Sequence, residues 1–318
     1  MFRYLLKIAT GLRRQQHRRV GSLLMRVALA TCGQYPDLDD DDRSIVPELA
    51  KLGIHAEPAV WDDDGIDWDR FDLVVVRSTW DYPERREAFL DWAARVPRLA
   101  NNVSVLRWNT DKRYLEDLAG AGVPVVPTRW LHPGDAPHLP PDGEYVLKPS
   151  VGAGSRGAAR FQLADTGERR RAEEHARSLL DAGSTVMVQP YLSAVDTAGE
   201  TALLFIGGAF SHAIRKAPLL EPGDTDVEGL FRAETITPRT PSESELAVAE
   251  KTLAGVAESV DGDLLYARVD LVPGPDGDPV LLEVELTEPS LFLARGRDAA
   301  ARLAAAIGTR LDRVLKTG

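Results

Sequence analysis

From residue 25 onward, short apolar runs alternate with stretches whose apolar residues recur at helical spacing. This alternation is typical of a parallel sheet with helices on its faces. Strands are predicted at 27–30, 56–60 and 73–76, and helices at 44–52, after Pro83 and at 112–119. Gly53 is expected to end the first helix, because glycine tolerates the positive φ of that position. The N-terminal part is therefore predicted to be a small α/β domain.

Beyond Pro124 the strand pattern predominates. Strands are predicted at 125–130, 144–148, 158–163, 185–189, 201–206, 210–214, 265–272 and 280–286. Helices are predicted at 168–181, 242–260 and 298–315. The expected architecture is an α/β domain followed by an α+β catalytic part.

Composition narrows the class of protein. A chain of 318 residues with 44% hydrophobic and 27% charged residues is expected to form one large core or two to three packed subdomains. Its formal net charge of -11 argues against general nucleic-acid binding, which needs a basic surface. Cys32 is the single cysteine, which excludes disulfides within the chain and cysteine zinc sites, favours the cytoplasm, and is expected to be a buried strand residue.

The segment 1–24 is basic and contains no acid. Its charged residues are Arg3, Lys7, Arg13, Arg14, Arg18 and Arg19. It could be an amphipathic anchor or a targeting segment, but we favour a flexible extension, since it lacks a long apolar stretch and a small-residue cleavage site. No apolar run in the chain reaches the roughly 20 residues of a membrane span.

A glycine-rich segment follows the predicted strand at 144–148 and precedes another strand. Small residues let backbone N–H groups approach phosphate oxygens closely, and Lys148 adds a positive charge. The segment is neither a Walker motif nor a Rossmann fingerprint, both of which lead into a helix. A simple turn is the alternative. The candidate phosphate-binding residues are Lys148, Ser150, Gly152, Gly154 and Ser155.

Two acidic strands near the C-terminus carry a stronger signal. Strand alternation puts Arg268 and Asp270 on one face, and likewise Glu283 and Glu285. The turn sequence at 273–279 joins the strands into a hairpin whose polar faces coincide. Clustered carboxylates repel one another unless a cation is present, and Mg²⁺ shared with nucleotide phosphates is the usual solution. The alternative is a solvated polar face on an edge hairpin.

Residues between these two features complete a candidate nucleotide site. An apolar strand runs into Gln189, Tyr191 and Leu192, where an extended backbone could pair with adenine. Glu200 is a candidate acceptor for ribose hydroxyls. Two cations at the end of a predicted strand are candidate ligands of the terminal phosphate: Arg215 and Lys216. Each of these assignments has a structural alternative.

The stretch 77–82 follows an apolar strand, at the edge where open α/β sheets place ligands. Arg77 could hold a substrate carboxylate with two hydrogen bonds. The alternative is a helix entry in which Asp81 is the cap and Pro83 begins the helix. The substrate candidates in this stretch are Arg77, Ser78, Trp80 and Asp81.

Taken in chain order, these residues resemble the ATP-grasp superfamily from Met25 to the C-terminus. The matching positions for nucleotide and metal are Lys112, Lys148, Gln189, Tyr191, Leu192, Glu200, Arg268, Asp270 and Glu283. Glu285 departs from the family, which usually has asparagine there. The resemblance implies ATP and Mg²⁺ as cofactors, with Asp270, Glu283 and Glu285 as metal ligands, and an ATP-grasp fold behind an N-terminal α/β pre-ATP-grasp domain.

The segments 77–82, 108–112, 199–202 and 288–293 resemble one ATP-grasp subgroup more closely. That subgroup contains the cyclo-ligase that closes O-ureido-D-serine into D-cycloserine, and it adds Glu288 and Ser290 to the substrate candidates. The domains implied are 1–24, a basic extension; 25–109, the pre-ATP-grasp domain; 110–192, the small subdomain with the glycine-rich loop; and 193–318, the large subdomain with the magnesium site.

The resemblance implies phosphoryl transfer to a small carboxylic or amino-acid-derived substrate, then attack of a nitrogen on the acyl phosphate. Arg268, Lys216 and Arg215 would be catalytic. Alternatives are a ligase that joins two molecules and a silent nucleotide-binding module. The oligomeric state is not predicted.

Overall fold

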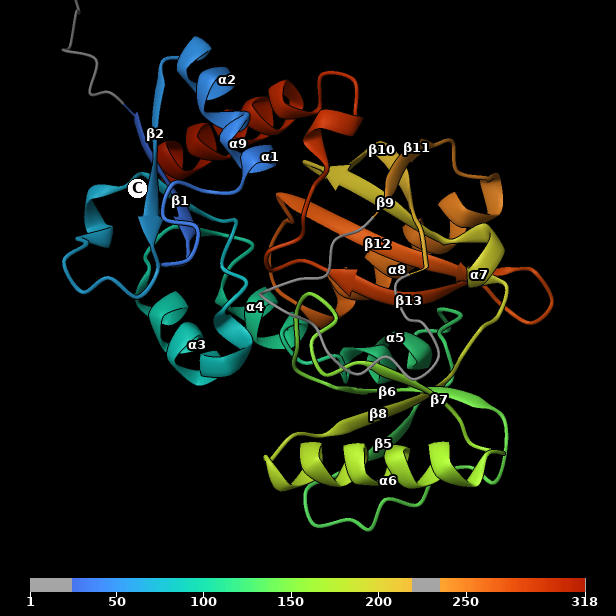
Figure 1. Cartoon of the computed structure of the whole chain (residues 1–318). Coiled ribbons are helices and arrows are strands. Elements are labelled where there is room, and N and C mark those ends of the chain that lie inside the picture. The colour runs from blue at the N-terminus through green and yellow to red at the C-terminus, as the bar shows by residue number, and fades with distance from the viewer. Residues whose placement is uncertain (1–24, 219–234, 318) are drawn as a thin grey trace, which may run out of the picture.

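The computed structural model describes residues 25–218 and 235–317 (Figure 1). Three sheets with their covering helices make up this part of the chain. The basic segment 1–24 lies outside the described residues, so the expectation of a flexible extension stays a prediction. Within the described ranges no helix combines the length and apolar character needed to cross a bilayer.

The first sheet is parallel. Its strands run in the order β2 (Ile54–Val60), β1 (Met25–Thr31), β3 (Leu73–Val76) and β4 (Leu99–Ala100). The three strands predicted here are confirmed, whereas the two-residue β4 is too short to leave a pattern. The helical elements of this region are α1 (Asp40–Arg43), α2 (Ile45–Lys51), η1 (Trp68–Arg70), η2 (Tyr82–Arg85), α3 (Arg86–Arg95), α4 (Val103–Asn109) and α5 (Tyr114–Gly120).

Helices cover both faces of this sheet, which explains why its strands read as continuous apolar runs. Val27 and Leu29 pack in a core shared with α2, and Ala28 and Ala30 pack in a core shared with α3. The C-terminal helix α9 (Ala299–Thr317) packs against α2 and lies beside the first sheet (Figure 1). The last helix of the chain therefore completes the first domain.

The second sheet is antiparallel and has α6 (Thr166–Asp181) on one face. Its order is β5 (Arg129–Leu131), β8 (Val186–Pro190), β6 (Glu144–Pro149) and β7 (Ala159–Gln162). Core residues of β6 and β8 alternate with residues that face away from α6, and that second face is available to a ligand.

The strand predicted at 125–130 is mostly wrong. Regular pairing begins only at Arg129, and Val125 forms a single bridge to Leu281. Pro124 and Pro127 explain the difference, because proline has no N–H to donate to a ladder. This stretch instead connects the second and third sheets.

The third sheet is antiparallel throughout and contains the predicted acidic hairpin. Its order is β11 (Ile236–Arg239), β10 (Ala209–Lys216), β9 (Glu200–Ile206), β12 (Tyr266–Pro273) and β13 (Pro279–Glu285). The other helical elements are α7 (Val195–Ala198), α8 (Glu243–Ser259) and η3 (Leu293–Arg295).

One face of the third sheet packs on α8. On the opposite face Leu204 and Ile206 share a core with α9, and the polar side chains of β12 and β13 lie on the same face. Leu203 and Phe205 share a core with Ala249 and Val256 of α8. The second sheet lies across the polar face, with α6 on its far side (Figure 1). The predicted domain boundaries at 109/110 and 192/193 stay predictions, although each sheet falls inside one of the predicted parts.

Candidate active site

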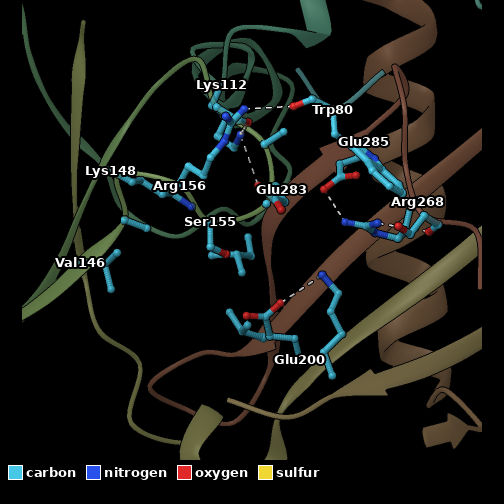
Figure 2. A pocket seen from close by; sticks show the side chains of 18 of the residues that line it. Trp80, Lys112, Val146, Lys148, Ser155, Arg156, Glu200, Arg268, Glu283 and Glu285 are labelled. Carbon is cyan, nitrogen blue, oxygen red and sulfur yellow. Dashed lines mark hydrogen bonds and ion pairs between the residues drawn. The ribbon is translucent and has the colours of Figure 1, made fainter. Parts of the chain in front are cut away.

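A cavity of about 620 Å³ lies between the second and third sheets and extends to the first domain. This volume is in the range of small-ligand sites. Most of the residues predicted from the sequence line it (Figure 2). They are Trp80, Lys112, Lys148, Gly152, Gly154, Ser155, Gln189, Tyr191, Leu192, Glu200, Lys216, Arg268, Glu283, Glu285, Glu288 and Ser290.

The acidic hairpin forms as predicted. Arg268 pairs with Glu285 and Asp270 with Glu283 across β12 and β13, so the four polar side chains share one face. Asp270, Glu283 and Glu285 bring carboxylate oxygens within 4.8 Å of one another. A β-bulge follows Asp270 and shifts the register of the remaining pairs.

Four cations balance these carboxylates. Lys216 Nζ lies 2.6 Å from Asp270 Oδ2, and Arg268 Nε lies 2.9 Å from Asp270 Oδ1. Arg268 also pairs with Glu285. Lys112 Nζ lies 3.7 Å from Glu283, and Lys148 adds its charge at the same end of the cavity (Figure 2).

The surroundings shift the pKa values of these carboxyl groups in opposite directions. Burial opposes ionisation of Glu283, but the surrounding lysines and arginine together hold its pKa below the usual range. Burial, together with the negative charges of Glu283 and Asp270, raises the pKa of Glu285 to about 7 despite the opposing charge of Arg268. Burial and the charge of Glu285 raise the pKa of Glu288 to about 8. The positive charge around Glu285 and Glu288 is therefore too small to offset their burial and mutual repulsion.

This donor set fits a hard divalent cation. Carboxylate oxygens are the ligands that Mg²⁺ prefers, and an added cation would favour the charged forms of Glu285 and Glu288. Glu283 and Glu285 line the cavity, whereas Asp270 is fully buried and held by Lys216 and Arg268. Glu283 and Glu285 are thus the accessible candidate ligands. Asp270 is a third candidate ligand whose carboxylate is already held by two cations.

The glycine-rich loop faces the acidic hairpin across the cavity (Figure 2). Lys112 Nζ donates to the carbonyl of Gly152 at 2.8 Å, which fixes the loop relative to the metal end. Ser155 has a φ of 61°, a left-handed conformation that a residue with a side chain adopts at a cost. Burial lowers the pKa of Lys148, which lines the same cavity.

The other end of the cavity is apolar. Val146 of β6 and Leu282 of β13 face it from the two sheets, and Leu192 and Val195 border it. A planar base between two aliphatic walls is a common arrangement in nucleotide sites. The amide of Gln189 donates to Thr128 Oγ1, so this side chain is already engaged.

Comparisons with known proteins identify the family. A family model described as the N-terminal domain of D-cycloserine synthetase DcsG matches residues 27–101. The cycloserine biosynthesis protein DcsG of Streptomyces lavendulae is 41% identical over 90% of this chain and 98% of its own length. This chain belongs to the DcsG family of D-cycloserine synthetases. The crystal structure of DcsG superposes with a TM-score of 0.81 at 38% identity, over 90% of this chain and 99% of that one.

More distant structures establish the DcsG fold as ATP-grasp. D-alanine–D-alanine ligase from Bacillus anthracis, solved with ATP, matches 92% of this chain and all of its own, with a TM-score of 0.62 at 17% identity. The ATP-grasp ligase PsnB with Mg and ADP matches 90% of this chain and 98% of its own, with a TM-score of 0.58 at 17% identity. The predicted fold class is confirmed.

Besides the buried Asp270, five predicted site residues do not line the cavity of this DcsG relative. They are Arg77, Ser78, Asp81, Ser150 and Arg215. Arg77 does hold a carboxylate, but it is Asp42 of the same chain, and Ser78 binds the other oxygen of that carboxylate. The carboxylate of Asp81 accepts a hydrogen bond from Trp61 Nε1 and forms an ion pair with Arg85. In this structure the three side chains hold the first domain together, and their assignment as substrate contacts stays a prediction that these contacts do not support.

The other two residues, Ser150 and Arg215, form hydrogen bonds with backbone groups of neighbouring segments. Ser150 exchanges backbone hydrogen bonds with Thr185 and Lys112, which places it behind the loop. Arg215 donates to the carbonyls of Thr197 and Ala198 and so braces the turn before β9. Arg215 therefore lies outside the cavity lining, and its catalytic role stays a prediction that these contacts do not support.

Several lining residues were missed by sequence reasoning. Arg156 reaches from the glycine-rich loop to Glu84 at 2.5 Å and to the carbonyl of Trp80 at 3.0 Å (Figure 2). Strand alternation could have identified Val146, because it occupies the face opposite to the buried Leu147 beside it. Leu282 lines the cavity together with its neighbour Glu283 because the bulge after Asp270 interrupts the alternation. No local signal marks Arg156 as a bridge to the first domain.

Gly199 positions both Glu200 and Lys216, and we expect Gly199→Ala to disrupt them. Its φ is 72°, and an added Cβ would lie 2.4 Å from the carbonyl oxygen of Lys216. The β9–β10 pairing would have to shift, costing about 2 kcal/mol of unfolding free energy and raising KM for ATP.

Gly208→Ala is the matched control for that variant. Gly208 has a φ of 82° in the turn joining the same strands, but nothing lies within 4 Å of its added Cβ. Thermal melting and ADP-release kinetics on both variants separate backbone strain from the clash. Equal effects of the two substitutions would contradict the expectation.

Proposed function

We propose that this protein is an ATP- and magnesium-dependent cyclo-ligase that converts O-ureido-D-serine into D-cycloserine through an acyl phosphate. Near-full-length similarity to DcsG carries this proposal. The cavity supports it, because loop lysines, hairpin carboxylates and an apolar slot converge there.

The chain would use its two cavity ends for different tasks. Val146, Leu192 and Leu282 would hold the adenine ring, and Glu200 would accept the ribose hydroxyls. Lys112, Lys148 and the backbone of 152–155 would hold the phosphates near the hairpin. This orientation would put the terminal phosphoryl group beside the carboxylate cluster.

Glu283, Glu285 and Asp270 would hold magnesium, which when bound neutralises charge on the transferring phosphoryl group. Arg268 would stabilise charge on the acyl oxygen, and its contacts with Asp270 and Glu285 fix its guanidinium. Lys216, tied to Asp270 and within 3.4 Å of Glu200, would hold the nucleotide side of the same end.

Ring closure needs an enclosed and oriented substrate more than further catalytic groups. Holding the nitrogen against the acyl carbon supplies an effective molarity on the order of 10⁵ M or more. Trp80, Glu288 and Ser290 wall the cavity beside the metal end and would bind the rest of the substrate. We further infer a cytoplasmic reaction on a small amino-acid-derived molecule, consistent with a single buried cysteine.

The decisive assay incubates the purified full chain with ATP, Mg²⁺ and O-ureido-D-serine and follows ADP release with mass spectrometry of the product. We expect one ADP for each ring formed, with no second amine present. Ring formation only after addition of a second amine, or ATP binding without ADP release across a panel of acids, would overturn the proposal.

A further inference from the structure

The segment that follows β13 is fixed by side chains from two parts of the chain, the loop after β3 and strand β12. The carbonyls of residues 288–290 accept hydrogen bonds in turn from Trp80 Nε1 at 3.1 Å, Arg77 at 2.7 Å and Arg268 at 3.2 Å. Consecutive carbonyls held in this way leave little freedom to the backbone. Any side chain that points from this segment into the cavity is therefore pre-positioned.

Glu288 is such a side chain. It lines the cavity and is only 7% exposed. Among residues 25–218 and 235–317, no side chain forms a hydrogen bond or ion pair with its carboxylate; the ionised form is favoured by the charges of Lys112 and Arg268 and by its own backbone N–H. A buried carboxylate without partners is costly, and such groups in native proteins call for an explanation.

The neighbours of Glu288 indicate where in the reaction it lies. Its carboxylate is close enough to Glu285, Lys112 and Arg268 to be influenced by their charges. It therefore lies at the end of the cavity where the acyl phosphate would form. The other charged groups there are already paired: Lys112 with Glu283, and Arg268 with Asp270 and Glu285. The missing partner is a hydrogen-bond donor supplied by the ligand.

Resting on the proposed function, we propose that Glu288 is the catalytic acceptor for the attacking nitrogen of the substrate. Its carboxylate accepts the N–H, which orients the nitrogen lone pair toward the acyl carbon. The C–N bond then forms, the C–O bond to phosphate breaks, and the proton passes from nitrogen to Glu288. Phosphate leaves with its electron pair, so atoms and charges balance. Removal of the carbamoyl group from the ring nitrogen is a separate hydrolysis.

Glu288→Gln separates the two halves of the reaction. The amide keeps the shape of the side chain but cannot take the proton, so ring formation should fall by about 10²-fold or more. Formation of the acyl phosphate should persist. Adding hydroxylamine, ATP and Mg²⁺ together with O-ureido-D-serine should therefore give the acid hydroxamate at close to the wild-type rate. Glu288→Asp keeps a carboxylate and should form the ring at an intermediate rate.

The melting temperature distinguishes a catalytic role of Glu288 from a structural one. Because Gln replaces a buried carboxyl group that has no protein partner, the melting temperature of Glu288→Gln should be unchanged or higher. Glu250→Gln, the same substitution on the exposed face of α8, is the control and should behave as wild type.

Three results would overturn the assignment while leaving the proposed function intact. These are a wild-type rate of ring formation by Glu288→Gln, a parallel loss of hydroxamate and ring, or a lower melting temperature with activity lost in proportion. Failure of the wild-type protein to form either ring or hydroxamate would instead remove the proposed function itself.

Discussion

Replacing Glu283 by glutamine reduces ADP release by about 10³-fold with little loss of stability, because several kcal/mol of charge stabilisation depend on this ligand. Glu283 lines the cavity from β13 and pairs across the hairpin with Asp270. Lysine and arginine charges hold its pKa low, so it stays ionised and available to a metal. The amide keeps the side-chain volume but offers one neutral oxygen, which weakens a magnesium ligand.

The measurement combines steady-state ADP release with calorimetric titration of Mg²⁺ in the presence of a non-hydrolysable ATP analogue. We expect Mg²⁺ binding to weaken in parallel with turnover. Glu258→Gln, an exposed position on α8, should match wild type in both assays. Wild-type ADP release by Glu283→Gln would show that this glutamate is not a metal ligand.

The same hairpin shows what the sequence could predict. Arg268, Asp270, Glu283 and Glu285 needed only strand alternation and a turn between the strands, both of which are local properties. The glycine-rich loop could likewise be predicted from a single stretch of sequence. The partners across this hairpin lie at most 17 positions apart, and their side chains were placed on the correct face.

Long-range partners were beyond this kind of reasoning. Arg156 contacts Glu84 across 72 positions, and α9 returns to cover the first sheet. The strand predicted at 125–130 forms only from Arg129 onward, because Pro124 and Pro127 have no N–H to donate to a ladder. Arg77 was expected to hold a carboxylate, and it does; the sequence did not indicate that the carboxylate belongs to Asp42, 35 positions earlier.

Replacing Arg77 by methionine destabilises the protein by about 4 kcal/mol, because it leaves the buried Asp42 without its cation. The guanidinium is 1% exposed, lies 2.8 Å from Asp42 Oδ1 and stacks 4.9 Å from the ring centroid of Tyr266. It also donates to the carbonyl of Pro289 and so joins the first sheet to the segment that carries Glu288. A fall of about 10 °C in melting temperature is expected.

A double-mutant cycle tests whether this arginine acts through Asp42. Asp42→Leu combined with Arg77→Met removes both charges, so we expect the pair to be more stable than the sum of the single variants implies. Chemical denaturation gives the coupling free energy, and substrate kinetics on the folded fraction give KM for the acid. A variant of Arg77 with an unchanged melting temperature but a raised KM would restore Arg77 as a substrate contact. The structural role instead predicts loss of folded protein, because the only carboxylate within reach of this guanidinium among the described residues is that of Asp42.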